Sequence, residues 1–292
     1  MYSLKTKDLE LKLEIIEVKA LCQHEQTLTP MIDKLVIEFK NWASLNNPVI
    51  VDENNVVLDG NHRAMVFKKL DFKYIAVCKI DYFNPHVLLK YWYRHVKMFK
   101  DHSILIDFLN KKNTIIAEKG TYQELRDELI KDPLALGMQL DGKCYLVKYP
   151  EKQTSNAIQA YKNVKNIENF LETLNYSWDY IPCQFMLDSE FFKKLSKKDL
   201  ILITPHITKK MVVDASLDGK VFSPKTTRHV IPARPLNVKV PIRWFNETVS
   251  LEKINKRFAS FLQSKNVRRF PPGQVIDGRF YGEEVFVFFE QK

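Results

Sequence analysis

The stretch Val56–Ala64 (VVLDGNHRA) places an acid, a glycine and two basic side chains close together. Its apolar start predicts a strand, Gly60 allows a sharp turn, and the following residues predict the start of a helix. The first turn of a helix has free N–H groups and the positive end of the helix dipole, so it can bind an anion. His62 and Arg63 add donors that suit phosphate oxygens, and Asp59 would suit a Mg²⁺ ion placed between carboxylate and phosphate. We therefore expect a phosphate site here; the alternative is a capped helix with surface charges.

A second polar stretch, Ser223–His229 (SPKTTRH), holds two hydroxyl groups, an arginine and a histidine in its last four residues. These groups could surround a phosphoryl group in transfer. A polar turn before a strand explains the same residues, and on this stretch alone it is the simpler interpretation. A third candidate is Glu25 of the His24-Glu25 pair, which could act as a general base or simply face solvent.

The chain of 292 residues carries 45 lysines and arginines against 35 aspartates and glutamates, a formal net charge of +10. A basic surface can bind nucleic acid, and local basic sites can bind the phosphates of a small anion. A third explanation is an excess of solvated lysines. The basic residues are spread along the chain, which favours solvated lysines together with a phosphate site over a nucleic-acid partner.

The four cysteines are widely spaced and include no C-x-x-C pair: Cys22, Cys78, Cys144 and Cys183. This spacing argues against a disulfide scaffold and against zinc, and it indicates reduced thiols. No apolar segment reaches the roughly 18–20 residues that a membrane helix needs. The N-terminus is charged and lacks the apolar core of a signal peptide. We expect a soluble, cytoplasmic protein without a membrane partner.

The N-terminal part of the chain predicts a compact mixed α/β unit. A helix is expected from Thr29-Pro30 to near Asn46-Asn47, because threonine and proline are favoured at helix starts. Pro48–Val51 and Val56–Leu58 predict a hairpin, and Tyr74–Ile80 predicts a central strand. The rest of the chain predicts a helix over 121–130 with a capping box, a hairpin turn at Asp141-Gly142, an accessory helix within 150–175, a helix over 251–263 and a strand over 284–289.

In their order and spacing, these motifs resemble the ParB/sulfiredoxin-like fold and, more narrowly, the free L-serine kinases built on that fold. The first part of the resemblance lies in His24-Glu25, Asn47–Val51 (NPVIV), Val57–Arg63 (VLDGNHR) and Asp81-Tyr82. The second part lies in Thr226–His229 (TTRH), Pro232–Leu236 (PARPL) and Val240-Pro241. The resemblance covers residues 13–95 and 200–245.

The resemblance implies a role for each matching residue. Glu25 would take the proton of the serine hydroxyl, and Asp59 would help to hold Mg²⁺. The nucleotide phosphates would be bound by Gly60, Asn61, His62 and Arg63, and the phosphoryl group or the serine by Thr226, Thr227, Arg228, His229 and Trp92. For Trp92, a position in the hydrophobic core is at least as good an explanation as a role in substrate binding. Asn61 departs from the family pattern, which has histidine there, so a role that needs a titratable group at this position would be lost.

We expect a mixed α+β protein with two parts. Residues 1–95 would form a ParB/sulfiredoxin-like nucleotide-binding domain. Residues 96–292 would form a second α/β portion that carries the TTRH motif and an accessory helical segment, and that completes the active-site cleft. Residues 96–199 match no motif and could form a lid, an oligomer contact or walls that select the substrate. The sequence does not decide the oligomeric state.

The implied function is Mg²⁺-dependent transfer of a phosphoryl group from ATP or ADP to free L-serine, giving O-phospho-L-serine. One alternative is a ParB-like nucleotide and DNA-binding module, which would need a Gly-Glu-Arg-Arg box and a following helix-turn-helix, whereas the chain has Gly-Asn-His-Arg. Another alternative is a kinase of a different small alcohol. A sulfiredoxin-like reaction is disfavoured because Gly60 and Asn61 stand where a cysteine would be needed. The sequence decides neither the phosphoryl donor nor the pathway that uses the product.

Overall fold

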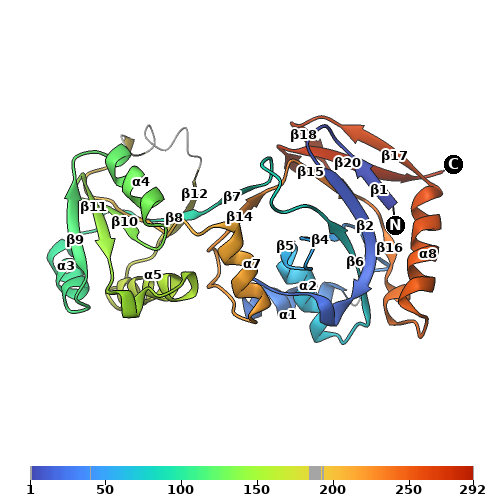
Figure 1. Cartoon of the computed structure of the whole chain (residues 1–292), viewed down its shortest axis with the longest axis horizontal. Helices are drawn as coiled ribbons and strands as arrows, with labels where there is room; N and C mark the ends of the chain where they lie inside the picture. The colour runs from blue at the N-terminus through green and yellow to red at the C-terminus, as the bar shows by residue number, and fades with distance from the viewer. Residues whose placement is uncertain (1, 40, 184–191, 193, 292) are drawn as a thin grey trace. The chain divides into compact units, whose positions relative to one another are not determined.

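The computed structural model describes residues 2–39, 41–183, 192 and 194–291 of the chain. The chain forms two compact units, and each has its own hydrophobic core. Unit 1 consists of Met1–Leu88 together with His229–Lys292, and unit 2 consists of Leu89–Arg228. Both units combine helices and strands, which confirms the expected α+β class (Figure 1).

Unit 1 is built on a five-stranded sheet with the order β1-β2-β6-β4-β5. Its strands are β1 (Tyr2–Lys5), β2 (Glu10–Glu17), β6 (Tyr74–Lys79), β4 (Val49–Val51) and β5 (Val57–Asp59). The central position predicted for the strand that begins at Tyr74 is confirmed: β6 lies antiparallel to β2 and parallel to β4. The predicted hairpin is also confirmed, because β4 pairs with β5 in antiparallel register.

The helices of unit 1 are η1 (Val18–Ala20), α1 (Thr29–Phe39), α2 (Asn61–Lys69), η3 (Ile242–Asn246) and α8 (Leu251–Gln263). The helix predicted to start at Thr29 is confirmed, but its predicted end near Asn46-Asn47 is wrong. The chain leaves the helix after Phe39 through a turn and then forms β3 (Ser44–Leu45). This short strand pairs with β16 (Val240–Pro241), a distant partner that no local signal reveals.

Residues 229–292, expected in the second portion, instead supply part of the core of unit 1. Val238, Phe245 and Phe258 are buried in the same cluster as Leu13 and Val77. The strands of this segment form a three-stranded sheet and a separate hairpin, drawn in orange and red in Figure 1: β15 (Ala233–Leu236), β20 (Glu284–Glu290) and β17 (Lys265–Phe270), then β18 (Gln274–Ile276) and β19 (Arg279–Tyr281). The helix predicted over 251–263 and the strand predicted over 284–289 are confirmed as α8 and β20.

An asparagine docks α8 onto β2. The Asn255 side-chain oxygen accepts a hydrogen bond from Ile15 N at 2.8 Å, and its nitrogen donates to Ile15 O at 2.8 Å. β1 pairs with β2 only as far as Leu13, so the main chain of Ile15 lies beyond this pairing. Buried main-chain groups need such partners, and the side chain supplies both of them.

Unit 2 is built on a six-stranded sheet that is antiparallel throughout. In spatial order its strands are β12 (Asp179–Pro182), β8 (Trp92–Val96), β13 (Leu200–Ile203), β10 (Leu136–Leu140), β11 (Lys143–Lys148) and β9 (Ile115–Lys119). Its helical segments are α3 (His102–Asn110), α4 (Tyr122–Lys131), η2 (Glu151–Gln153), α5 (Ala157–Thr173) and α7 (Lys209–Leu217). The chain passes between the units in β7 (Leu88–Lys90) and β14 (Arg228–Val230).

Three local predictions in unit 2 are confirmed. Asp141 and Gly142 join β10 to β11 with φ angles of 53° and 73°, as a type I′ turn requires. Thr121 is the N-cap of α4, as predicted, and accepts a hydrogen bond from Glu124 N at 3.2 Å; the Glu124 carboxylate, however, accepts from Gly120 N at 2.9 Å and not from Thr121 N as a capping box requires. The accessory helix predicted within 150–175 is α5, which buries one face in the core. Among the residues that the structure describes, no helix has both the length and the apolar character needed to span a membrane.

Candidate active site

The turn from β5 to α2 has the geometry expected of an anion site. Gly60 precedes the helix with a φ of 95°, in the left-handed region, and a Cβ there would lie 2.8 Å from Arg63 Nη2. Glycine is therefore required for both the backbone angle and the space. The first helical hydrogen bond runs from Ala64 N to Gly60 O, and no side chain caps this end. Main-chain N–H groups in the first turn of an α-helix have no acceptor in a preceding turn and can therefore bind a ligand.

Asp59 stands beside this helix end as an ionised carboxylate. Its Oδ2 lies 3.4 Å from Arg63 Nη2 and 3.3 Å from Arg234 Nη1, and 40% of its side chain is exposed. Burial would raise the pKa of Asp59, but the positive charges of Arg63, Arg234 and Arg279 outweigh it and lower that pKa. A cavity of about 20 Å³, with room for about one water molecule, lies among these residues. Arg234 was not assigned to the site from the sequence, although it belongs to the PARPL motif.

The guanidinium of Arg63 forms its hydrogen bonds with groups of unit 1. Arg63 Nη1 donates to the carbonyl oxygens of Asn47 and Pro48, the latter at 3.1 Å, while Nη2 pairs with Asp59. These contacts fix the start of β4 and the carboxylate of Asp59 relative to α2. The Arg63 side chain is thus already hydrogen-bonded within unit 1, unlike the phosphate-binding role expected for it from the sequence. Within the described residues, the buried Asn61 Oδ1 has no hydrogen-bond partner.

The segment that leads into His24-Glu25 runs parallel to β5, in the direction of Asp59. Cys22 forms a parallel bridge with Val56, its N–H donates to Asn55 O at 3.0 Å, and its carbonyl accepts from Val57 N at 2.9 Å. The His24 ring is hydrogen-bonded to the main chain of Val57, and its side chain is only 1% exposed. Burial lowers the pKa of His24, so this ring is neutral at neutral pH. Glu25 is partly exposed, as a general base must be.

His229 joins this group in unit 1. Its Nε2 lies 2.7 Å from the Tyr82 hydroxyl, and its ring meets the His24 ring edge to face at 5.1 Å. Burial raises the pKa of Tyr82, so the phenol keeps its proton. Tyr82 belongs to the Asp81-Tyr82 motif but was not assigned to the site from the sequence. Its hydrogen bond shows that it orients the His229 ring.

The remaining sequence-predicted residues lie together in unit 2. Trp92 Nε1 donates to Thr227 O at 3.0 Å, and the Arg228 guanidinium lies 5.9 Å from the centre of the Trp92 ring. Thr226 is fully buried, and its hydroxyl donates to Ser223 O at 2.8 Å. This hydroxyl stabilises the turn instead of facing a ligand. The structure thus brings the predicted residues together in two groups, one in each unit.

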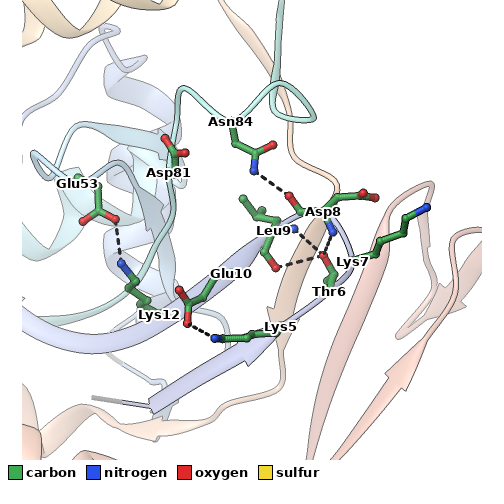
Figure 2. A pocket seen from close by; sticks show the side chains of 10 residues that line it. All are labelled: Lys5, Thr6, Lys7, Asp8, Leu9, Glu10, Lys12, Glu53, Asp81 and Asn84. Atoms are coloured by element: carbon green, nitrogen blue, oxygen red, sulfur yellow. Dashed lines mark hydrogen bonds and ion pairs between the residues drawn. The ribbon is translucent and has the colours of Figure 1, made fainter.

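Figure 2 shows a larger hollow in unit 1, of about 380 Å³, that none of the sequence-predicted site residues lines. Four of its charged side chains form two ion pairs: Lys12 lies 3.2 Å from Glu53, and Lys5 lies 3.5 Å from Glu10. Asn84 Nδ2 donates to the main-chain oxygen of Asp8 at 2.8 Å. Charges that are paired in this way leave little net attraction for an ionic ligand.

Comparison with known proteins shows similarity to L-serine kinases and to a ParB-like protein. No protein-family model matches it. It is 27% identical over 236 residues to an ATP-dependent L-serine kinase of Staphylothermus marinus, covering 78% of this chain and 89% of that protein. The chain is a relative of the L-serine kinases. An ADP-dependent L-serine kinase of Thermococcus kodakarensis is 23% identical over 254 residues, with coverage of 82% and 95%. A ParB-like protein of Sulfolobus acidocaldarius is 25% identical over 238 residues, with coverage of 80% and 98%.

Solved structures agree on the fold of this serine-kinase relative. A free serine kinase in complex with AMP matches with a TM-score of 0.60 and 22% identity, covering 84% of this chain and 97% of that one. A mutant free serine kinase in complex with ADP matches with a TM-score of 0.62 and 20% identity, covering 82% and 95%. The chain thus shares its fold with nearly the whole length of a free serine kinase.

Proposed function

We propose that the chain transfers a phosphoryl group from ATP or ADP to the hydroxyl of free L-serine, giving O-phospho-L-serine. The observation that carries this proposal is the end of β5 in unit 1, where the ionised Asp59 adjoins an uncapped helix N-terminus and the His24-Glu25 segment runs alongside. The similarity to L-serine kinases, which extends along most of their length, supports the choice of substrate.

Glu25 would act as the general base that takes the proton of the serine hydroxyl. It is partly exposed, and it follows the buried and neutral His24, so the local chain is fixed while the carboxylate remains accessible. Phosphoryl transfer requires positioning and charge stabilisation more than covalent participation by the protein. A carboxylate next to a phosphate-binding helix end fits this requirement.

The helix end of α2 would bind the donor's phosphate oxygens through the N–H groups of its first turn, with Asn61 and His62 as side-chain donors. Asp59 fits a role in holding Mg²⁺. No group of three or more metal-ligating side chains occurs in the described parts of the chain, but Mg²⁺ commonly takes only one or two protein carboxylates together with phosphates and water. When bound, the ion would neutralise charge on the phosphates. The ion pairs with Arg63 and Arg234 hold Asp59 ionised and in place.

The group in unit 2 would contact the serine or the phosphoryl group through Thr227 and Arg228, with Trp92 beneath them. His229 in unit 1 directly follows Arg228 in the chain, and it would contribute through the ring that Tyr82 orients. We also propose a cytoplasmic location. The four cysteines are free thiols, which suits a reducing compartment.

Direct product detection tests this function. The purified chain is incubated with Mg²⁺, L-serine and either ATP or ADP, and O-phosphoserine is sought by mass spectrometry. L-Threonine and L-homoserine serve as competing acceptors, and EDTA tests the metal requirement. We expect O-phosphoserine from at least one donor and much less product from the other alcohols. Folded protein that gives no O-phosphoserine with either donor would refute the proposal.

The DNA-binding alternative draws on the net charge of +10 and on the similarity to a ParB-like protein. Unit 2, which follows the predicted nucleotide-binding part, is built on a six-stranded antiparallel sheet and so differs from a helix-turn-helix module. Titration of duplex DNA at two salt concentrations separates the two functions. Tight, salt-dependent binding without phosphoserine formation would favour the alternative.

A further inference from the structure

In unit 2, three consecutive main-chain carbonyls each lie within hydrogen-bond distance of a donor side chain of β8 or α5. Arg94 Nη1 donates to Lys225 O at 3.1 Å. The buried Tyr161 hydroxyl lies 3.2 Å from Thr226 O, and its single proton is shared between this carbonyl, Pro205 O at 3.1 Å and Thr204 Oγ1 at 3.2 Å. Trp92 Nε1 donates to Thr227 O at 3.0 Å. The segment that carries the predicted substrate contacts is therefore held by its main chain.

The conformation of this segment is one that it would rarely adopt without support. Lys225 has a φ of 61°, in the left-handed region. A residue with a Cβ pays for this conformation, which persists when the surrounding contacts hold it. The Lys225 ammonium lies 4.6 Å from the centre of the Trp92 ring, so the side chain is placed as well as the carbonyl.

Arg94 is itself held by a carboxylate on α5. Its Nε lies 2.7 Å from Glu168 Oε1, and the two side chains are only 1% and 4% exposed. The same guanidinium donates to Trp92 O at 2.7 Å, so it joins β8 to the Lys225 segment. A buried guanidinium without a carboxylate would be costly. Glu168 therefore balances the buried charge of Arg94 and holds the guanidinium toward the two carbonyls.

We infer that Tyr161 and Glu168 of α5 are positioning residues for the transfer reaction. They fix the main chain of Lys225–Thr227, and through it they place Thr227 and Arg228 for the substrate. This inference rests on the proposed function for the role of those two residues. It assigns a role to α5, which lies within residues 96–199, where the sequence matched no motif.

The Tyr161→Phe variant removes one hydroxyl together with its contacts to Thr226 O, Pro205 O and Thr204 Oγ1, and Tyr149→Phe is its matched control. The Tyr149 hydroxyl is also buried in unit 2, but it makes no hydrogen bond within the described residues. We expect Tyr161→Phe to lower kcat/KM for L-serine about tenfold to 100-fold, since small misplacements of substrate-binding groups have effects of this size. Nucleotide affinity should stay unchanged, and Tyr149→Phe should match the wild type in both. Equal kinetics for the two variants would overturn the inference.

The buried ion pair offers a second test that separates positioning from stability. Either Arg94→Met or Glu168→Leu alone leaves a buried group without its partner and should lower the Tm strongly. The double variant Arg94→Met/Glu168→Leu removes both charges, so we expect its Tm to recover while kcat/KM for L-serine stays low. Recovery of both quantities would show a purely structural pair and overturn the inference.

Hydrogen exchange supplies a readout that does not depend on activity. We expect faster amide exchange over residues 223–228 in Tyr161→Phe than in Tyr149→Phe, because the carbonyl contacts are weakened. Unchanged exchange in this segment would overturn the inference. A wild-type protein that makes no O-phosphoserine would instead refute the proposed function, and the exchange result would still report on the carbonyl contacts.

Discussion

In unit 1 the candidate site is a set of charges at the end of a strand, whereas in unit 2 it is a stretch of main chain held by buried donors. Asp59 keeps 40% of its side chain exposed and draws its ionisation from neighbouring arginines. Arg94 and Glu168, by contrast, are almost fully buried, and the guanidinium of Arg94 binds carbonyl oxygens.

The difference indicates a division of labour between the two units. Exposed and ionised groups can meet a proton, a phosphate or a metal ion, so unit 1 has the chemical groups for the transfer. Buried donors fix geometry and have no access to a ligand, so those of unit 2 can influence the reaction only by holding the segment before Arg228. Substitutions in unit 1 should therefore change turnover most, and those beneath the unit 2 segment should change the use of serine.

The largest effect is expected at the charge of Asp59. Asp59→Asn keeps the shape of the side chain but removes the carboxylate that would hold Mg²⁺ and balance three arginines. We expect kcat to fall by about 100-fold or more, as with loss of other preorganised charges in active sites. Steady-state kinetics with L-serine gives the number, and a melting curve shows whether the fold persists. Turnover within a few-fold of the wild type would break the comparison, since the charges of unit 1 would then be dispensable.

A smaller effect, on both stability and activity, is expected at the turn glycine. Gly60→Ala introduces a Cβ at 2.8 Å from Arg63 Nη2 and at a φ of 95°. Gly278→Ala is the matched control in unit 1, because its φ is 76° but nothing lies within 4 Å of the added Cβ. The control should cost only the backbone strain, about 1–2 kcal/mol. Gly60→Ala should cost more in a urea denaturation experiment and should also reduce turnover; equal losses in both variants would contradict the geometry described for the turn.

The smallest effect concerns pH and the buried His24. Burial lowers its pKa in the folded state, so below the ordinary histidine pKa the unfolded state binds a proton that the folded state does not. Stability from the neutral ring is thus complete above about pH 6.5 and is lost as the pH falls, by at most about 1.4 kcal/mol per pH unit. The stability advantage of the wild type over His24→Gln should shrink between pH 7.5 and 5.5 in melting experiments. A difference that is constant across this range would contradict a buried neutral ring.

The sequence revealed the local features of unit 1 because their signals are local. The apolar run before Asp59, the turn at Gly60 and the helix after it follow one another directly between Val57 and Lys69, and all three are confirmed. The return of residues 229–292 to unit 1 could not be read in this way. It depends on contacts such as that of Asn255 with Ile15, which are 240 residues apart in the sequence.

In the candidate site, the sequence motifs indicate which residues are neighbours, but they do not reveal the contacts that those residues make. The motifs named the residues around β5 and the TTRH stretch in the right order. Nothing in the sequence showed that Arg63 binds main-chain carbonyls, or that the Thr226 hydroxyl donates a hydrogen bond to Ser223 O. The buried pair of Arg94 and Glu168 was also hidden, because charged residues are almost never fully buried unless they are paired, and the pairing is visible only in the fold.

The central claim is that the chemistry lies at the end of β5 and not at the larger hollow of Figure 2. The most direct test measures O-phosphoserine formation from L-serine by the wild type, by Glu25→Gln and by Glu53→Gln, a matched change in a residue that lines that hollow. We expect Glu25→Gln to lose activity by about 10²–10⁴-fold, as for a general base, while Glu53→Gln retains it. Full activity in Glu25→Gln, or its loss in Glu53→Gln, would contradict the account.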